Sequence, residues 1–325
     1  MAAKTSKEAA DFIVPLNMNG LEGRMLRMPP PKKYADREIL LIYGHHSSLE
    51  RWWGLAQNLN KYGGLTMPDL PGFGGMDSMY KIGKTPDLDA MADYLASFVK
   101  WRYKRQKVVI MGLSFGFIVV TRMLQRYPSL TKKVELLVSA VGFSHYDDFV
   151  FSKTRMTLYR LGTKVVGRWP WPFIFRYVAL DPFILRTVYH RTFNAKKKFA
   201  GADEDTMKRM MDMEIVLWHS NDVRTYMQTA YDMLTVDNCK KQVDLPVWHI
   251  GAGTDQYFHP DLIEQHMRII FSDFQFFKND NLRHAPSVIA TAEESADFIP
   301  LAVRKALQKH DEKKKPVRRT KRSSR

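Results

Sequence analysis

The stretch "IMGLSFGF", residues 110–117, places a serine between two glycines at the end of an apolar run. Glycine costs stability inside a strand or a helix, so Gly112 and Gly116 need a physical reason. One reason is a strand that turns sharply into a helix, which brings backbone close to both sides of Ser114. The alternative is an ordinary strand end with a capping serine.

Strand-like and helix-like segments alternate before residue 143 and again after residue 236. Apolar runs of strand length cover residues 39–44, 107–112, 133–142, 245–253 and 274–279. Helical patterns cover residues 49–62, 86–105, 115–127 and 261–271, and a closing helix is expected from about residue 286. Two earlier strands are joined at Asn19-Gly20, a dipeptide typical of tight hairpins. The alternation predicts an α/β fold, with a mostly parallel central sheet and helices on both faces.

Between residues 143 and 236 the alternation stops, and helical, aromatic-rich segments replace it. We expect this part to be a helical cap over the carboxyl edge of the sheet, where open α/β folds bind ligands. The predicted core has two parts, residues 1–142 and 237–312. The predicted helical cap is residues 143–236, and the basic tail is residues 313–325. The tail is almost entirely basic and polar, so we expect it to be disordered.

The sequence Gly112-Leu113-Ser114-Phe115-Gly116 follows a predicted strand and precedes a predicted helix. This is the context of a nucleophile elbow, in which a serine hydroxyl is exposed at the start of a helix. Backbone N–H groups at that position stabilise developing negative charge. The context therefore favours the sharp turn over the plain strand end.

A nucleophilic serine needs a base, and the base needs an acid that orients it. Asp255 follows the strand at 245–253, and His284 follows the strand at 274–279. Both are expected in loops at the same edge as Ser114. For Asp255 the alternative is a loop aspartate that binds its own turn, and for His284 it is a solvent-exposed loop histidine. Asp147 or Asp148, after the preceding strand, is the alternative acid.

The developing oxyanion needs two donors. The backbone N–H of Phe115 is the first candidate, because this residue follows the serine. The loop after the first core parallel strand reads "IYGHHSS", which makes the N–H of His45 the second candidate. The adjacent His45 and His46 make a poor metal site, because no spaced partner accompanies them, and the alternative for them is a polar helix start. The pattern therefore predicts a reaction without a metal or a cofactor.

Together, "YGHHSSLERWWGLAQNL", "MPDLPGFGGMD", "GLSFG", "GTDQYF" and "RHAP" resemble the α/β-hydrolase-fold serine hydrolases with a helical cap. The resemblance covers most of residues 11–310. It implies Ser114 as nucleophile, His284 as base and Asp255 as orienting acid, with a cap that shapes the acyl or alcohol pocket. A serine nucleophile argues against the epoxide-hydrolase and haloalkane-dehalogenase branches, whose nucleophile is an aspartate.

Two residues depart from the family pattern. Tyr43 stands where the family usually has a histidine before the oxyanion glycine, and Arg283 stands where it usually has a glycine. We expect an esterase or lipase-like activity on a carboxylic ester. The same machinery serves thioesters, amides, C–C bonds and acyl transfer, and a non-catalytic binding protein on this fold is the rival of another class.

The net charge of +16 is concentrated in two segments. Residues 151–200 hold eleven Lys and Arg against one acid, and residues 304–325 hold eleven against two. Such segments attract anionic membrane surfaces, nucleic acid or acidic ligands, and no base-reading motif accompanies them.

The cap interleaves rings with cations, as in Trp169, Trp171, Phe173, Phe175 and Phe183 beside Arg168, Arg176 and Arg186. This mixture suits a membrane interface. The alternative is that the rings form the core of the cap, with the cations solvated outside.

The expected compartment is the cytoplasm, with peripheral membrane association through the cap and the tail. The stretch "MAAKTSKEAADF" lacks the apolar segment of a secretory signal, and no run approaches the roughly 20 apolar residues of a membrane-spanning helix. The single cysteine, Cys239, forms no internal disulfide, which agrees with a reducing compartment.

Overall fold

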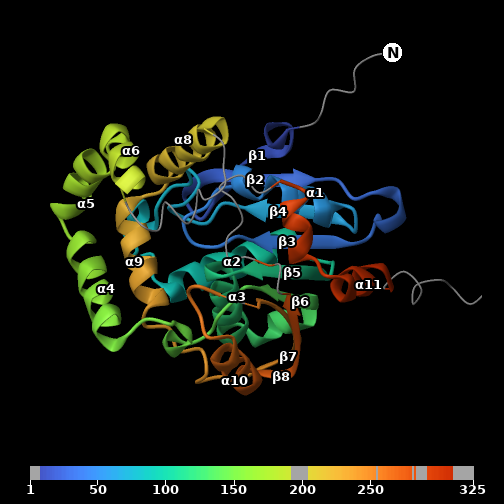
Figure 1. Cartoon of the computed structure of the whole chain (residues 1–325). Coiled ribbons are helices and arrows are strands. Elements are labelled where there is room, and N and C mark those ends of the chain that lie inside the picture. The colour runs from blue at the N-terminus through green and yellow to red at the C-terminus, as the bar shows by residue number, and fades with distance from the viewer. Residues whose placement is uncertain (1–7, 192–203, 254, 280–281, 283–290, 310–325) are drawn as a thin grey trace, which may run out of the picture.

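The computed structural model describes residues 8–191, 204–253, 255–279, 282 and 291–309. Its centre is an eight-stranded sheet in the order β1-β2-β4-β3-β5-β6-β7-β8 (Figure 1). The strands are β1 (Ile13–Met18), β2 (Leu21–Met28), β3 (Glu38–Ile42), β4 (Gly64–Pro68), β5 (Val108–Leu113), β6 (Val134–Ala140), β7 (Val243–Ala252) and β8 (Phe271–Asn279). Strands β1, β2 and β4 pair antiparallel, and the pairs from β4 through β8 are parallel. The predicted mostly parallel sheet is confirmed.

Helices cover the sheet on two sides. Figure 1 shows helices on either side of the strands. On one side lie α1 (Trp53–Asn60) and α11 (Leu301–Lys309), and on the other lie α2 (Leu88–Arg102), α3 (Phe115–Arg126) and α10 (Pro260–Ile270). The β1–β2 hairpin turns at Asn19 and Gly20, which both have positive φ, as the dipeptide predicts.

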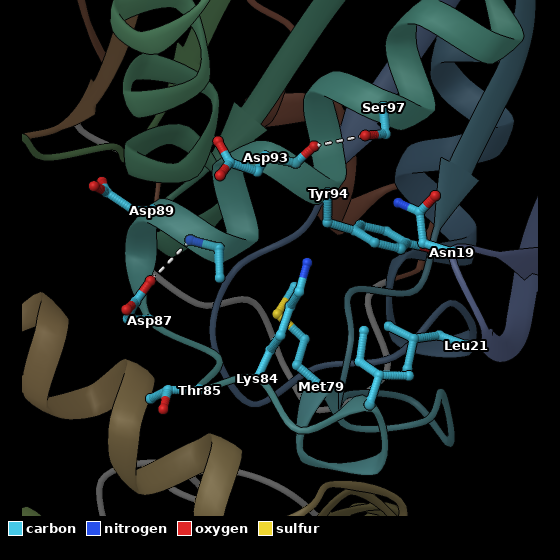
Figure 2. A pocket seen from close by; sticks show the side chains of 12 residues that line it. Asn19, Leu21, Met79, Lys84, Thr85, Asp87, Asp89, Asp93, Tyr94 and Ser97 are labelled. Atoms are coloured by element: carbon cyan, nitrogen blue, oxygen red, sulfur yellow. Dashed lines mark hydrogen bonds between the residues drawn. The ribbon is translucent and has the colours of Figure 1, made fainter.

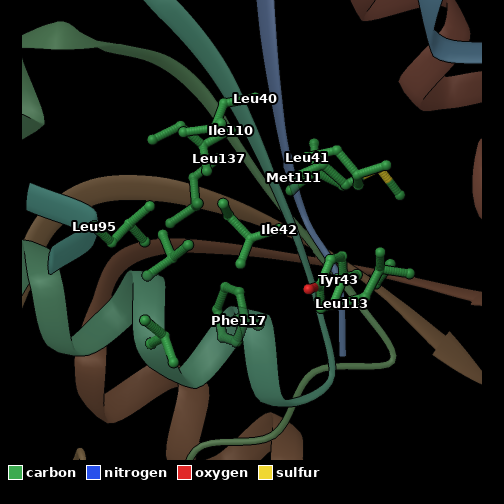
Figure 3. Packing of buried hydrophobic residues seen from close by; sticks show 14 of the residues in the cluster. Leu40, Leu41, Ile42, Tyr43, Leu95, Ile110, Met111, Leu113, Phe117 and Leu137 are labelled. Carbon is green, nitrogen blue, oxygen red and sulfur yellow. The ribbon is translucent and has the colours of Figure 1, made fainter. Parts of the chain in front are cut away.

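The core lies on both faces of the central strands. Alternate residues of a strand point to opposite faces, and both sets are buried here (Figure 3). Figure 3 shows Leu40, Ile42, Ile110 and Leu137 on the side of Leu95 and Phe117, and Leu41, Met111 and Leu113 on the other side. Burial on both faces explains why β3 and β5 are continuous apolar runs in the sequence.

An inserted helical region lies between β6 and β7. It contains α4 (Lys153–Val166), α5 (Trp171–Ile174), a π-helical turn (Phe175–Ala179), α6 (Pro182–Arg191), α8 (Glu204–Ser220) and α9 (Val223–Met233). In Figure 1 this region forms a separate group at one end of the molecule, with α4, α5 and α6 outermost. The predicted helical insertion is confirmed, and its limits at 143 and 236 stay a prediction.

The structure argues against one of the two interpretations of the rings in this insertion. Trp169, Trp171, Phe173 and Phe183 are exposed and do not form the core of the inserted region. Phe175 is the exception among the five rings, because it is half-buried and packs against Trp218 with ring centroids 6.1 Å apart.

The C-terminal elements also differ from the expected ranges. Strand β8 begins at Phe271 rather than 274, because the chain passes directly from α10 into the strand. The expected start of the closing helix at about residue 286 lies outside the described residues. After residues 291–293, which are not helical, a 3-10 helix covers Glu294–Phe298, and α11 follows Pro300, whose missing N–H and fixed φ suit a helix start. The basic tail at 313–325 lies outside the described residues. In the described ranges, no helix combines the length and the apolar character needed to span a bilayer.

Candidate active site

Ser114 occupies a strained turn between β5 and α3. Its φ of 44° and ψ of −114° lie outside the ordinary regions for a residue with a side chain. The turn is held on both sides, since the Ser114 N–H donates to the carbonyl of Ala140 at 3.1 Å and the Phe117 N–H donates to the carbonyl of Ser114 at 3.0 Å. Ser114 is also the N-cap residue of α3. The chain therefore presents this serine at the start of a buried helix.

The two flanking glycines are required by close backbone approach. A Cβ on Gly112 would lie 2.7 Å from the Cα of Phe117. A Cβ on Gly116 would lie 2.4 Å from the carbonyl oxygens of Ile42 and Tyr43. No side chain fits at either position, so the sharp strand-to-helix turn, and not a plain strand end, accounts for the glycines.

The loop after β3 approaches the same serine. A Cβ on Gly44 would lie 3.3 Å from the Cβ of Ser114, which places the next residue, His45, beside the candidate nucleophile. The His45 ring packs edge-on against Phe115, with centroids 5.6 Å apart. The N–H groups of His45 and Phe115 stay the predicted oxyanion donors.

The His45 side chain has a structural role of its own. Its Nε2 atom lies 3.0 Å from Oγ1 of Thr229 and 3.3 Å from the carbonyl oxygen of Tyr226, both on α9. Burial, and then the neighbouring His46, lower the pKa of His45 to about 3. The imidazole is therefore neutral, and it ties the loop after β3 to the inserted region.

The Tyr43 side chain links two loops near Ser114 through its hydroxyl group. Its hydroxyl donates to Oδ1 of Asp69 at 2.8 Å and accepts from the N–H of Leu70 at 3.1 Å. Burial, reinforced by the charge of Asp69, raises the pKa of Tyr43 well above its usual value. Arg24 holds the other carboxylate oxygen of Asp69 at 3.2 Å. Tyr43 thus joins the loops that follow β3 and β4, one residue before Gly44.

Of the predicted acid and base, Asp255 is among the described residues and His284 is not. Asp255 lies in the loop after β7, and its Oδ1 accepts the N–H of Tyr257 at 2.8 Å. This bond fixes the carboxylate in its own turn, which is the arrangement that the alternative interpretation describes. Since β5 and β7 run parallel in one sheet, Asp255 and Ser114 follow strand ends at the same edge. His284 and Arg283 lie outside the described residues, so the contact between Asp255 and His284 stays a prediction.

The alternative acids have other partners. Asp148 is fully buried, and its Oδ2 accepts the N–H groups of Ser144 and His145 at 2.9 Å each. Its other oxygen lies 2.5 Å from Nδ1 of His266 on α10. The side chain of Asp147 is 62% exposed. These contacts favour a structural role for Asp148 in its turn, and they leave Asp255 as the better candidate.

Sequence reasoning missed a second serine–histidine pair. Oγ of Ser139 on β6 lies 2.9 Å from Nδ1 of His249 on β7. Both residues are buried within the sheet, and burial lowers the pKa of His249 to about 3. A Cβ on Gly142 would lie 2.3 Å from Oγ of Ser139, so the backbone after β6 covers this hydroxyl. A covered serine with a weakly basic partner is a poorer nucleophile than Ser114.

A surface pocket of about 520 Å³ lies between the β1–β2 hairpin and the first turns of α2 (Figure 2). Its carboxylates are engaged, because Asp87 caps α2 through the N–H of Ala90 and Arg126 binds Asp89 and Asp93. None of its twelve lining residues is one of the predicted site residues. In the part of the chain that the structure describes, no cluster of His, Cys, Asp and Glu suits a metal ion.

A family model described as serine aminopeptidase, S33, matches residues 33–287 of the sequence. The chain belongs to this family. It is therefore a serine hydrolase with the α/β-hydrolase fold and an inserted helical region. The sequence matches no curated protein.

Solved structures share the fold at low sequence identity. A thermophilic esterase from Thermogutta terrifontis is 18% identical with a TM-score of 0.61, over 91% of this chain and 98% of its own. An enol-lactonase from Burkholderia xenovorans LB400 is 13% identical with a TM-score of 0.62, over 91% and 98%. An N-formylmaleamic acid deformylase from Pseudomonas putida S16 is 17% identical with a TM-score of 0.59, over 88% and 98%. At these identities the likeness shows the fold alone.

Proposed function

We propose that the protein hydrolyses a carboxylic ester through an acyl-enzyme formed on Ser114. The observation that carries this proposal is the strained conformation of Ser114, with φ at 44° between two glycines that no other residue can replace. Strained backbone at a helix start costs of order 1–3 kcal/mol and persists where function requires it. The loop after β3 also supports the proposal, because a Cβ on Gly44 would lie 3.3 Å from the Cβ of Ser114.

The proposed reaction has two steps. In the first, the Ser114 hydroxyl attacks the ester carbonyl, its proton passes to His284, and the N–H groups of Phe115 and His45 bind the oxyanion. The C–O bond then breaks as His284 returns the proton to the leaving alcohol. In the second step, water attacks the acyl carbonyl while His284 takes its proton, the bond from the acyl carbon to Oγ of Ser114 breaks, and His284 returns the proton to Ser114 as the carboxylic acid leaves. Asp255 holds the histidine in the tautomer that accepts this proton.

The inserted region supports a role in shaping the substrate site. Thr229 and Tyr226 of α9 contact His45, so α9 lies over the loop that borders Ser114. We propose that residues 143–236 act as the cap and that the substrate is lipid-like and met at an anionic membrane, because this region is rich in aromatic and basic residues.

The test is an activity panel. Nitrophenyl esters of increasing acyl length are compared with a thioester and an anilide of the same acyl group, using the wild type, Ser114→Ala and Ser139→Ala. We expect ester turnover that increases with acyl length, a loss of at least about 10³-fold in Ser114→Ala, and residual turnover in Ser139→Ala. Preference for the anilide would overturn the ester assignment. Turnover that survives in Ser114→Ala would overturn the proposed nucleophile.

A further inference from the structure

The outermost helices of the inserted region carry an unusual apolar surface. Leu158 and Leu161 on α4 are 61% and 58% exposed, and Trp169, just after this helix, is 85% exposed. Phe173 on α5 and Phe183 on α6 are 61% and 77% exposed. We call these five residues the outer apolar face. In Figure 1 the helices that carry it form the edge of the molecule farthest from α11.

Single exposed apolar residues are ordinary, but a concentration on neighbouring elements marks an interaction surface. Leu158 and Leu161 lie one turn apart on the same side of α4, and Val165 continues this stripe while 42% exposed. Tryptophan is the most notable member, because an exposed indole is enriched where a protein meets a membrane interface. Helix α4 packs against α9, and its buried residue is Met156, which is not part of this stripe.

The charge on the same helices identifies the partner. Residues 151–191 hold eight Lys and Arg and a single acid, Asp181. The Asp181 carboxylate accepts the N–H groups of Phe183 and Ile184, so it is turned toward its own helix start. Lys153, the first residue of α4, and Arg168, which directly precedes Trp169, are both exposed. Arg186 is paired with Asp212 of α8 at 2.6 Å, so the positive charge that remains beside the rings comes from the other cations of this segment, among them Lys153 and Arg168.

A second copy of this chain is a poor occupant of that surface. A two-fold interface places the same patch against itself, which would bring one basic surface against another. An anionic bilayer removes this conflict, because each basic residue near the surface gains about 1 kcal/mol while the rings enter the headgroup region.

We propose that the outer apolar face docks on an anionic membrane surface, with Trp169 and Phe183 as its inserting side chains. Docking itself does not require Ser114. We also propose that the substrate is an ester present in that membrane, and this part rests on the proposed function. In the docked arrangement, α8 and α9 lie between the bilayer and the loop that borders Ser114.

The experiment uses the full chain with vesicles of phosphatidylcholine alone and vesicles that also contain phosphatidylglycerol. We expect co-sedimentation with the second type only, weakened by added salt. The double variant Trp169→Ala/Phe183→Ala is expected to bind at least about tenfold more weakly. Its matched control is Trp101→Ala, because Trp101 is 49% exposed on α2 of the core and is expected to bind like the wild type.

The charged arm compares Lys153→Glu/Arg168→Glu with Lys104→Glu/Lys107→Glu, which changes the net charge equally on the core. A loss of about tenfold or more is expected for the first pair alone. Equal loss for both pairs would overturn the proposed surface, because bulk charge would then explain the binding. The proposal would also be overturned if the wild type bound both types of vesicle equally. The same holds if Trp169→Ala/Phe183→Ala changed the oligomeric state but not the binding to vesicles.

Two further results separate docking from catalysis. Ser114→Ala is expected to bind vesicles like the wild type. If the wild type binds vesicles but hydrolyses no ester, the proposed function is refuted and the docking surface is supported. If the wild type hydrolyses soluble esters but does not bind vesicles, only the docking surface is refuted.

Discussion

Nε2 of His46 lies 3.2 Å from Oε1 of Glu214, and this contact joins the loop after β3 to helix α8. Glu214 is only 3% exposed, and Nδ1 of His46 lies 3.3 Å from Nδ2 of Asn221. The His46 ring also packs against Trp218, tilted by 48° with centroids 4.3 Å apart. The inserted region therefore holds the loop that borders Ser114 through a buried polar contact as well as through His45.

Replacing Glu214 by alanine is expected to weaken the attachment of the inserted region to the loop after β3 and to lower the free energy of unfolding. Glu214→Ala leaves a buried partner without its bond, which costs about 1–3 kcal/mol in the free energy of unfolding. Urea unfolding measures the difference. Glu264→Ala is the control, because Glu264 pairs with Arg268 on the surface of α10, where such pairs contribute below about 1 kcal/mol. Equal losses in the two variants would contradict a special role for Glu214.

The two glycines Gly116 and Gly162 are expected to respond in opposite directions to the same substitution. Gly116→Ala forces a Cβ to within 2.4 Å of two carbonyl oxygens, so we expect unfolding at lower urea and loss of ester turnover. Gly162 lies in α4, where its added Cβ would meet no atom within 4 Å beyond its chain neighbours and the adjacent helix backbone, so Gly162→Ala is expected to stabilise by about 0.5–1 kcal/mol. A Gly116→Ala enzyme with wild-type stability would refute the close approach.

The Tyr43 hydroxyl supplies a third prediction. Tyr43→Phe keeps the ring but leaves Asp69 and the N–H of Leu70 without this partner, which is expected to cost about 1–3 kcal/mol. The matched control is Tyr177→Phe, because Tyr177 is exposed on the inserted region and is expected to change stability by less than about 0.5 kcal/mol. Thermal unfolding of both variants at one pH tests the comparison.

The nucleophile elbow was predictable because its cause is local. Glycines at 112 and 116, a β-branched strand before them and a helix after them specify the turn within ten residues. The parallel sheet was predictable for a similar reason, since strands buried on both faces are continuous apolar runs.

Other features depend on contacts that the local sequence does not encode. Ser139 and His249 meet only because β6 and β7 pair in one register, and the signal that marks them is a polar residue inside each apolar strand. The exposure of Trp169 and Phe183 depends on how α4, α5 and α6 pack, which helical periodicity alone does not reveal. Burial of an aromatic segment is therefore a property of the tertiary arrangement.

Stability is expected to fall in acid. The pKa of His45 and of His249 is about 3 in the folded protein, against an ordinary value of 6.5. Between these values the unfolded chain binds more protons than the folded chain, so each histidine lowers the free energy of unfolding by about 1.4 kcal/mol per pH unit as the pH falls. Above the ordinary value their contribution is constant.

His249→Gln separates this effect from other titrations. Glutamine can still form a hydrogen bond with Ser139 and does not titrate, so the acid slope is expected to decrease by about 1.4 kcal/mol per pH unit. Urea unfolding at a series of pH values measures the slope in both proteins. An identical slope would show that His249 is protonated equally in the folded and unfolded states.

The most direct measurement is the site of reaction with a fluorophosphonate. The reagent forms a covalent bond with the hydroxyl of an activated serine, and tryptic peptide masses identify which serine carries the adduct. We predict a single adduct on Ser114 in the wild type and in Ser139→Ala, and none in Ser114→Ala. An adduct on Ser139, or a folded wild type that does not react, would contradict the assignment of Ser114 as the nucleophile.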